Sequence, residues 1–388
     1  MASRYDGDGT HLDFAGRKYM NVLIAPDKFK DCLSAGAVVE AIAGGVRQRW
    51  PDARVDTCPM ADGGEGTVVA MVQATGGRFV TRRVTGPLPE MKVDATFGLL
   101  ADGRTAVIEM ASASGLHLLP VSHRNPLHTT TFGTGELLKF AAEMGCTRIV
   151  VGIGGSATTD AGIGCLQACG CHIVLQDGSY APPTEPLCGR DLPEVLAIKS
   201  HRGGALDAVD IVIASDVTNP LYGPDGAALV YGPQKGASTN EVRWLDTELR
   251  RLAERTGHVD IARQSGAGAA GGLGFGLSAF LSARLHSGAA LVADAVGLVD
   301  RIGKADLVFT GEGRVDCTSV AGKVVGYIDN LCRAQFRPLI VVCGAADAQV
   351  RALLHARILA LTDIADEQYA KAHASALITR LLAEAALT

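Results

Sequence analysis

Short apolar runs, each ended by glycine, proline or charged residues, divide this chain into strand–helix units. Residues 21–25 (NVLIA) form such a run, and Ser34 then precedes apolar residues at 38, 39, 42 and 46, the spacing of one helix face. Further runs lie at 54–60, 149–152, 211–214, 306–310, 338–343 and 358–361. Short apolar runs that alternate with helical patterns predict an α/β protein with a parallel sheet.

A second pattern begins near residue 79. Apolar and polar residues alternate over 79–84, 93–97 and 106–108, with turn residues at Gly86-Pro87 and Asp102-Gly103. Alternation with a period of two predicts antiparallel strands. Because strand–helix units occupy both ends of the chain, we expect one domain to be inserted into the other.

The segment 149–170 (IVVGIGGSATTDAGIGCLQACG) joins a β-branched run to a loop of glycines and hydroxyls and then to a helical pattern. Glycines let backbone N–H groups approach a ligand, and a helix N-terminus favours negative charge. The loop therefore predicts an anion cradle. The alternative is an ordinary strand–turn–helix junction, because such junctions in α/β proteins often contain glycine.

Charged residues gather after the predicted strands. The acidic ones are Asp27, Asp62, Glu65, Asp160, Asp216, Glu312 and Asp316, and the lysines are Lys28, Lys30, Lys235 and Lys323. Ligands of open α/β sheets bind at the carboxyl ends of the strands, which makes these residues candidates for a site. Asp216 beside Asn219 fits a metal or hydroxyl contact, although turn initiation by Asn-Pro explains the same pair.

A second glycine-rich segment, 265–276 (SGAGAAGGLGFG), contains G-x-G-x-x-G. As a dinucleotide fingerprint it is weak, because no convincing strand precedes it and no acidic residue follows at the end of a second strand. We expect a flexible loop that precedes a helix over 277–285 and lines a cleft.

Composition narrows the possible partners. The chain has 388 residues, enough for about two domains, with 5 % aromatic residues and a net charge of −5. Few aromatic residues and no basic stripe argue against a nucleic-acid partner. No apolar run reaches the ~18 residues of a membrane span. Ten cysteines without paired zinc-ligand spacing predict reduced thiols and a cytoplasmic enzyme, and the polar residues 1–19 predict a disordered extension.

The inventory of glycine loops, carboxylates and lysines is the one that phosphoryl transfer requires. Donors hold phosphate oxygens, carboxylates hold Mg²⁺, and one carboxylate lies near the attacking hydroxyl. The sequence has no Walker A loop, no protein-kinase signature set, no H-E-x-x-H and no G-x-S-x-G at Ser156. The residues therefore predict a small-molecule phosphotransferase or another anion-binding α/β enzyme, and they leave the substrate open.

Nine motifs, in this order, resemble the bacterial glycerate kinase family: APDKFKDCLSA, ADGGEGT, IEMASASGL, TTTFGTGEL, GIGGSATTDAG, SDVTNPLYGPDGAA, YGPQKGA, GAGAAGGLG and TGEGRVDCTSVAGK. The resemblance implies ATP-dependent phosphorylation of D-glycerate with Mg²⁺, with 2-phosphoglycerate as the favoured product. It also implies two α/β domains with the active site in the cleft between them. A Rossmann/flavodoxin-like domain would comprise residues 20–77 and 291–388, and a mixed α/β inserted domain residues 78–290. Glycerate and ATP would be the partners of a monomer or homodimer, without nucleic acid or membrane.

Matched position by position, the resemblance assigns candidate roles to individual residues. The catalytic candidates are Asp27, Lys30, Asp160 and Asp216. The candidates for binding substrate or nucleotide are Lys28, Gly154, Gly155, Ser156, Asn219, Lys235, Arg314 and Lys323. The candidate Mg²⁺ ligands are Asp62, Glu65, Glu312 and Asp316. One of Asp27, Asp160 or Asp216 would orient the glycerate hydroxyl, and Arg314 or a lysine would pair with the glycerate carboxylate.

The chain departs from the family pattern at several positions. Lys28 replaces a frequent serine, Ala161 a usual glycine and Val325 a usual proline, and the sequence diverges after Cys343. These departures bear on the details of the cleft and on the last helices, not on the activity. Two alternatives to a glycerate kinase stay open on other grounds. One is a kinase for another small hydroxy or sugar acid, and the other is a catalytically inactive regulator that binds a metabolite. The second alternative predicts stabilisation by ligands without release of ADP.

Overall fold

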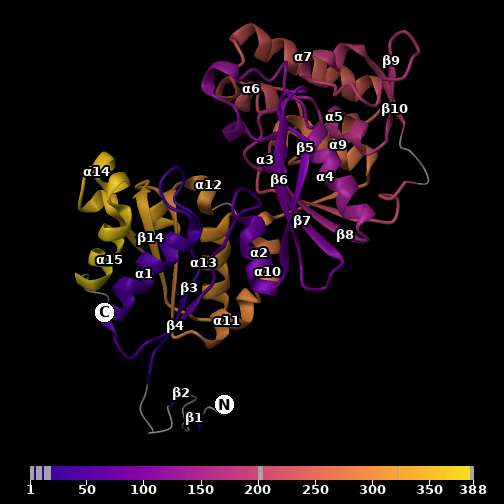
Figure 1. The fold of residues 1–388 in the computed structure, drawn as a ribbon. Coiled ribbons are helices and arrows are strands. Elements are labelled where there is room, and N and C mark those ends of the chain that lie inside the picture. The colour runs from indigo at the N-terminus through magenta and orange to yellow at the C-terminus, as the bar shows by residue number, and fades with distance from the viewer. Residues whose placement is uncertain (1–3, 6–10, 13–18, 200–203, 321, 385–388) are drawn as a thin grey trace. The chain divides into compact units, whose positions relative to one another are not determined.

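The computed structural model describes residues 4–5, 11–12, 19–199, 204–320 and 322–384. The chain divides into two compact units, which we call unit 1 (residues 1–62 and 289–388) and unit 2 (residues 63–288) (Figure 1). Most of the extension expected at 1–19 lies outside the described residues. Within it, β1 (Arg4–Tyr5) pairs antiparallel with β2 (His11–Leu12).

Unit 1 is built on a five-stranded parallel sheet. The strands lie in the order β15 (Arg357–Ala360), β14 (Leu339–Ala346), β13 (Leu307–Val315), β3 (Asn21–Ile24) and β4 (Arg54–Thr57). Numbered along the chain, this is the 2-1-3-4-5 order of flavodoxin-like sheets, in which the strand order reverses between the first and third strands. Here that reversal falls between β3 and β13, which confirms the predicted α/β class.

Helices cover this sheet, and the first of them follows the sequence prediction closely. Ser34 caps α1 (Ala35–Arg49) by accepting a hydrogen bond from the Ala37 N–H at 3.2 Å. The core of the unit joins α1 to α15 (Ala374–Glu384) and to one face of the strands. The remaining helices are α10 (Gly288–Ala295), α11 (Leu298–Lys304), α12 (Cys317–Val320), α13 (Val324–Ala334) and α14 (Glu367–Ala372), with 3-10 turns at Val350–Ala352 and Leu361–Asp363.

Unit 2 contains a six-stranded mixed sheet. Its order is β12 (Arg284–His286), β11 (Asp210–Ala214), β8 (Arg148–Gly152), β7 (Thr105–Glu109), β6 (Lys92–Leu99) and β5 (Arg78–Thr85). The first four strands are parallel, whereas β5, β6 and β7 pair antiparallel, as the alternation of residues predicted. A separate hairpin pairs β9 (His172–Leu175) with β10 (Val195–Lys199).

The helices of unit 2 belong to two hydrophobic cores. They are α2 (Thr67–Thr75), α3 (Ala111–Ser114), α4 (Phe132–Glu143), α5 (Ile163–Ala168), α6 (Ala227–Tyr231), α7 (Thr239–Arg255), α8 (Val259–Ala262) and α9 (Ala269–Phe280). Short 3-10 helices lie at Leu116–Leu118, Val121–His123, Gly189–Glu194 and Pro233–Lys235.

The boundary between the units differs from the sequence expectation at residues 63–77. The change of pattern near residue 79 and the family resemblance predict that this segment belongs to the first domain. In the structure α2 packs on β6 and β7, and a Cβ at Gly98 of β6 would lie 2.3 Å from the Val72 side chain. Such close packing against the mixed sheet puts residues 63–77 in unit 2.

The segment 265–276 is not the flexible loop that its glycines suggested. Residues 265–268 form a turn and 269–276 the start of α9. The segment is largely buried, and a kink at Ala270, Gly271 and Gly272 has left-handed backbone angles. The Ala161 N–H donates to the Gly271 carbonyl at 3.0 Å, and a Cβ at Gly271 would lie 2.0 Å from the Thr158 carbonyl oxygen. These glycines therefore provide close backbone packing rather than mobility.

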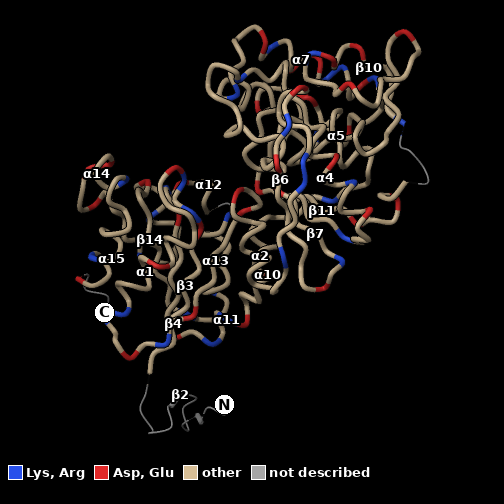
Figure 2. The backbone as a smooth tube through the Cα atoms, in the orientation of Figure 1, with Lys and Arg blue, Asp and Glu red and all other residues tan. Residues whose placement is uncertain are grey.

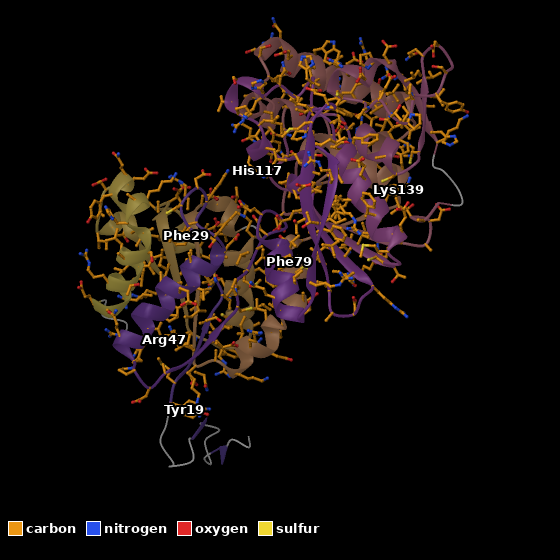
Figure 3. All side chains as sticks on the ribbon, in the orientation of Figure 1. Tyr19, Phe29, Arg47, Phe79, His117 and Lys139 are labelled. Atoms are coloured by element: carbon orange, nitrogen blue, oxygen red, sulfur yellow. The ribbon has the colours of Figure 1, made fainter. Side chains whose placement is uncertain are left out.

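Acidic and basic residues are interspersed along the backbone of each unit (Figure 2). Large side chains divide between core and surface, as Phe29 is buried in unit 1 while Phe79 on β5 is 48 % exposed (Figure 3). All ten cysteines are free thiols. Within the described ranges, no helix has both the length and the apolar character needed to cross a membrane.

Candidate active site

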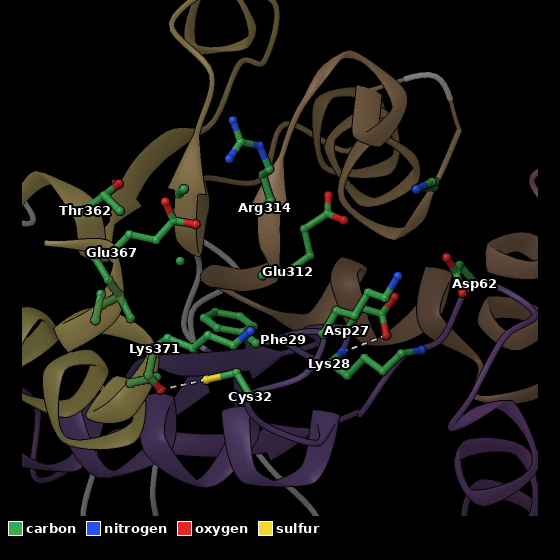
Figure 4. Close-up of a pocket in the computed structure, with 18 residues that line it drawn as sticks. Asp27, Lys28, Phe29, Cys32, Asp62, Glu312, Arg314, Thr362, Glu367 and Lys371 are labelled. Atoms are coloured by element: carbon green, nitrogen blue, oxygen red, sulfur yellow. Dashed lines mark hydrogen bonds between the residues drawn. The ribbon is translucent and has the colours of Figure 1, made fainter. Parts of the chain in front are cut away.

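A pocket of about 320 Å³ lies in unit 1 beyond the carboxyl ends of β3 and β13, where the strand order reverses (Figure 4). Open α/β sheets bind ligands at this point of the fold. Seven of the residues singled out from the sequence line the pocket: Asp27, Lys28, Lys30, Asp62, Glu312, Arg314 and Lys323. The structure therefore brings together residues that are almost 300 positions apart in the chain.

Asp27 is held by the backbone of the neighbouring strand. Its N–H donates to the Gly311 carbonyl at 2.8 Å, and one carboxylate oxygen accepts the Lys28 N–H at 2.7 Å. Just before this point along the two strands, the Thr310 hydroxyl donates to the Ala25 carbonyl at 2.8 Å. These bonds extend the pairing of β3 with β13 past the end of the strand, so they fix the position of the Asp27 carboxylate.

Two glycines of β13 allow this close approach. A Cβ at Gly311 would lie 1.9 Å from the Val342 carbonyl oxygen of β14. A Cβ at Gly313 would lie 3.1 Å from the Lys30 nitrogen and 3.2 Å from the Phe29 Cα. The T-G-E-G-R sequence thus places Glu312 and Arg314 in the pocket while its glycines make room for β14 and for the loop after β3.

The pKa of Asp27 is raised from 3.8 to about 7. Burial is the largest cause, since the side chain is 7 % exposed, and the negative charge of Asp62 adds to the effect. Lys28 and Lys323 act in the opposite direction. A carboxylate with a pKa near neutral pH has the strength that a general base requires.

Glu312 lies in a similar environment. Burial raises its pKa from 4.5 to about 7, Asp27 and Asp316 add to the rise, and Ser319 and Lys323 oppose it. Its Oε1 atom is buried without a hydrogen-bond partner. A buried carboxylate oxygen left without a donor is well suited to a cation, and Mg²⁺ is usually held by one or two carboxylates together with substrate phosphates.

The acidic residues of the pocket thus fit Mg²⁺ through their chemistry. Carboxylate oxygens such as those of Asp62 and Glu312 are ligands that Mg²⁺ prefers. In the part of the chain that the structure describes, no group of three or more His, Cys, Asp or Glu side chains has the arrangement of a complete metal site. A site completed by substrate phosphates is consistent with both observations.

Arg314 and Asp316 already have partners within unit 1. The Arg314 guanidinium is ion-paired with Asp347 at 2.8 Å, and both side chains are largely exposed. Asp316 caps α12, since one of its oxygens accepts the Thr318 N–H at 2.8 Å and the Thr318 hydroxyl at 2.6 Å. Burial raises the pKa of Asp316, but these hydrogen bonds and Lys323 outweigh it, so the pKa is lowered. Asp316 does not line the pocket.

The ADGGEG motif continues from unit 1 into unit 2 after Asp62. Glu65 is exposed there, at the start of α2. The N-terminus of α2, a position that attracts anions, is occupied by a side chain of β7. The Glu109 carboxylate accepts the N–H groups of Gly66 at 3.0 Å and Val68 at 2.9 Å.

In the loop 153–162, the expected anion cradle, the candidate residues differ in burial. Asp160 is fully buried, and its carboxylate accepts the N–H and hydroxyl of Thr131 at 2.9 and 2.8 Å and the Gly162 N–H at 3.1 Å. Burial raises its pKa, and these hydrogen bonds oppose the rise. Ala161 has a φ of 53°, in the left-handed region that favours glycine. Of the loop's candidates, Gly154 and Gly155 reach the surface and Ser156 is 8 % exposed.

Lys235 and Asn219 also have internal partners. The Lys235 ammonium is buried and donates to the Thr158 carbonyl at 2.6 Å, and burial lowers its pKa to about 7 while Asp160 opposes this. Asn219 donates to the Asp225 carbonyl and accepts the Tyr231 hydroxyl, both at 2.7 Å. Asp216 is half-buried and accepts the Gly288 N–H at 3.1 Å. These surroundings favour structural roles for Lys235, Asn219 and Asp160, and their direct contact with substrate stays a prediction.

Sequence reasoning missed part of the pocket wall, namely Phe29, Cys32, Thr362, Glu367 and Lys371. The rule that ligands bind beyond strand ends applies to the last strand as well, and it would have pointed to Thr362, directly after β15. Cys32 gave no signal, because its contact with the Lys371 carbonyl, 3.1 Å from its Sγ, joins residues far apart in the chain.

Comparison with known proteins agrees with the motifs. The model of the glycerate kinase family matches residues 22–388. The chain is 46 % identical to glycerate 2-kinase of Escherichia coli (strain K12) over 84 % of this chain and 85 % of that protein. It is 44 % identical to glycerate kinase of Bacillus subtilis (strain 168) over 89 % and 90 % of the two chains.

The fold is similar to that of a solved structure. The crystal structure of a "putative glycerate kinase 2" from Salmonella typhimurium LT2 matches with a TM-score of 0.78 and 42 % sequence identity. That match covers 94 % of this chain and 97 % of the other. With the family model and these relatives spanning most of its length, the chain belongs to the glycerate kinase family, and it is an enzyme of the phosphotransferase class.

Proposed function

We propose that the protein transfers the terminal phosphoryl group of ATP to D-glycerate, with Mg²⁺, and that the product is 2-phosphoglycerate. The observation that carries the proposal is the pocket at the β3–β13 reversal. It gathers the carboxylates of Asp27, Asp62 and Glu312 with the amines of Lys28, Lys30 and Lys323. Phosphoryl transfer depends on such positioning and charge stabilisation far more than on covalent chemistry by the protein.

We propose that Asp27 is the general base that accepts the proton of the attacking hydroxyl. Its raised pKa and its fixed position both support this role, because a base must be strong enough near neutral pH and must be correctly placed. The transfer forms a bond between the glycerate oxygen and phosphorus and breaks the bond from phosphorus to the ADP oxygen. The hydroxyl proton passes to Asp27.

Glu312 and Asp62 are the proposed Mg²⁺ ligands in this pocket. The unpartnered Oε1 atom of Glu312 supports its assignment, and Asp62 lines the same pocket. When bound, Mg²⁺ neutralises charge on the phosphate oxygens. Glu65 and Asp316, the other two candidates, do not line this pocket, and Asp316 is engaged at the start of α12.

The cations have separate proposed roles. Lys28, Lys30 and Lys323 would hold phosphate oxygens, since each lines the pocket and a lysine binds phosphate as a compact charge. Arg314 would pair with the glycerate carboxylate, exchanging its exposed partner Asp347 for the substrate. An exposed ion pair contributes little stability, so this exchange costs little.

In unit 2 we keep Gly154, Gly155, Ser156 and Asp216 as candidate substrate contacts. Asp160 and Lys235 are proposed to position the loop that carries these residues. Lys235 donates to the Thr158 carbonyl and Asp160 accepts from Thr131, so the two charged groups tie the loop to neighbouring elements. Because the side chains of Asp160 and Lys235 are buried, we propose that they position the loop and do not contact the substrate.

A panel of hydroxy acids offered with ATP and Mg²⁺ tests the proposal. We expect the highest kcat/KM with D-glycerate, measured as ADP formation in a coupled assay. Faster turnover of a larger sugar acid would assign the enzyme to that substrate instead. Binding of ADP without turnover of any acid would favour a regulator.

A further inference from the structure

One end of the pocket differs chemically from the end that holds Asp27 and Glu312. Glu367, Ala370 and Lys371 of α14 and Ala374, the first residue of α15, line that end. The spacing of three and one residues places Glu367, Ala370 and Lys371 on one face of α14, and Ala374 follows after the break at His373. The two alanines are buried, and the charged Glu367 and Lys371 are exposed at the rim.

The opposite wall of this end comes from the loop after β3 and from the end of β14. Phe29 is buried there, and Gly344 and Ala345 add little bulk to the wall. The thiol of Cys32 donates to the Lys371 carbonyl at 3.1 Å and so joins the two walls. Figure 4 shows Thr362, Glu367, Lys371 and Cys32 on one side of the pocket, and Asp27, Lys28 and Asp62 on the other.

We infer that this alanine-lined end, which we call the nucleoside slot, binds the adenosine part of ATP. The inference rests on the proposed function and adds to it the place and orientation of the nucleotide. A flat base needs apolar walls and a few polar groups at the edge, as ligand pockets generally have. Ala345, Ala370 and Ala374 supply the walls, and Thr362 and Glu367 supply groups that can bond the ribose hydroxyls or the base amine.

Charge fixes the direction in which the nucleotide lies. The triphosphate and its metal need lysines and carboxylates, and Lys28, Lys323 and Glu312 gather at the other end of the pocket. A three-carbon acid would leave most of the cavity of about 320 Å³ empty, since pockets of ~300 Å³ and above hold drug-sized molecules. The nucleoside therefore belongs in the slot and the phosphates beside Asp27 and Glu312.

The first test fills the slot. Ala370→Leu adds bulk to its buried wall, so we expect the Kd for ADP, measured by isothermal titration calorimetry, to rise about tenfold or more. The KM for D-glycerate stays within about twofold, because the acceptor lies elsewhere. Ala372→Leu on the same helix is the matched control, because Ala372 is exposed and does not line the pocket. It retains the wild-type Kd.

The second test needs no variant and therefore does not depend on how Ala370→Leu folds. Cys32 lines the slot, so ADP slows its alkylation by N-ethylmaleimide by about tenfold or more, whereas D-glycerate alone does not. Peptide mass mapping follows each cysteine separately. Cys169, a half-buried thiol of unit 2, serves as the internal reference, and its alkylation rate does not change with ADP.

The outcomes separate this inference from the proposed function. Unchanged ADP affinity in a folded Ala370→Leu protein, or an unprotected Cys32 in the presence of saturating ADP, overturns the slot even if D-glycerate is phosphorylated. Protection by D-glycerate instead of ADP also overturns it, because the slot would then hold the acceptor. Protection by ADP in an enzyme that turns over no glycerate supports the slot while the proposed function fails.

Discussion

Asp27 shows at the level of a single residue how a proposed functional position can oppose stability. Burial and the charge of Asp62 raise its pKa from 3.8 to about 7 in the folded protein. Between pH ~4 and ~7 the unfolded chain has already lost this proton while the folded protein keeps it. The free energy of unfolding therefore falls as pH rises through this range, and the penalty is complete above pH ~7. Glu312 contributes in the same direction.

Asp27→Asn removes this penalty together with the proposed base. We expect the free energy of unfolding at pH ~8, from urea denaturation, to rise by about 1–3 kcal/mol. We expect kcat to fall by about a thousandfold or more, because the amide cannot accept the proton. Asp31→Asn is the control, since Asp31 is exposed in the same loop and asparagine tolerates its left-handed backbone. A destabilised Asp27→Asn protein with normal kcat would show that Asp27 has a structural role only.

The pH profile follows from the same two carboxyl groups. kcat/KM for D-glycerate should be highest above pH ~7 and should fall at least about tenfold per pH unit well below it, because Asp27 and Glu312 must both be ionised. Raising the Mg²⁺ concentration should move the midpoint to lower pH, since a bound cation favours the ionised carboxylates. Initial rates between about pH 5 and 9 measure this. A flat profile would exclude both residues from the reaction.

Residues of the candidate site could be predicted from the sequence where they directly follow a predicted strand. Asp27, Lys28 and Glu312 follow or end apolar strands, and the rule that ligands bind beyond strand ends was sufficient to select them. Asp160 and Lys235 were selected in the same way, but both are buried. Their burial depends on Thr131 and Thr158, which contact them across the fold, and spacing in the sequence does not reveal such contacts.

At the scale of secondary structure, the start of α2 is stabilised by a carboxylate from another element. Glu109 of β7 accepts two N–H groups of its first turn. Glu109→Ala leaves those donors without this partner, so we expect a loss of about 1–2 kcal/mol of unfolding free energy in urea denaturation. Glu109→Gln should recover part of the loss, and Glu143→Ala, at an exposed glutamate on α4, should change little. Equal stability of Glu109→Ala and the wild type would rule out this capping role.

Strand β13 offers a test of how its glycines shape the pocket. Gly313→Ala places a Cβ 3.1 Å from the Lys30 nitrogen, so the loop after β3 must move by a few tenths of an ångström. We expect kcat/KM for D-glycerate to fall by about tenfold while the Tm changes little, because small displacements of catalytic groups are costly. Gly36→Ala, on α1 with no atom within 4 Å of the added Cβ, should leave activity unchanged. Full activity of Gly313→Ala would mean that the loop tolerates displacement.

Strands were predicted well where the spacing of apolar residues identified them. The structure of a glycine-rich segment was predicted poorly. The strands at β3, β8 and β11 and the antiparallel set β5–β7 match the apolar pattern. The glycines of 265–276 suggested a mobile loop, yet they pack against Thr158 and Ala161 at the start of α9. A glycine permits both flexibility and close backbone packing, and only the neighbouring chain decides between them.

For the whole molecule, the sheet order shows how motifs far apart in the sequence come to line one pocket. β3 and β13 are neighbours in unit 1, although the whole of unit 2 lies between them in the sequence. The two patterns of hydrophobic residues predicted a chain with one domain inserted into another. The place of α2 was not predictable, because it depends on packing against Gly98 rather than on the order of the elements.

Phosphorylation of D-glycerate in this pocket is tested most directly by the phosphorus NMR spectrum of the reaction with ATP, Mg²⁺ and D-glycerate. We predict a new phosphomonoester signal that is split into a doublet by the single proton on C2, and that is absent with Asp27→Asn. A triplet from the two protons on C3 would change the assigned product to 3-phosphoglycerate. A spectrum without any new phosphomonoester signal, from wild-type protein that binds ADP, would contradict the proposed function.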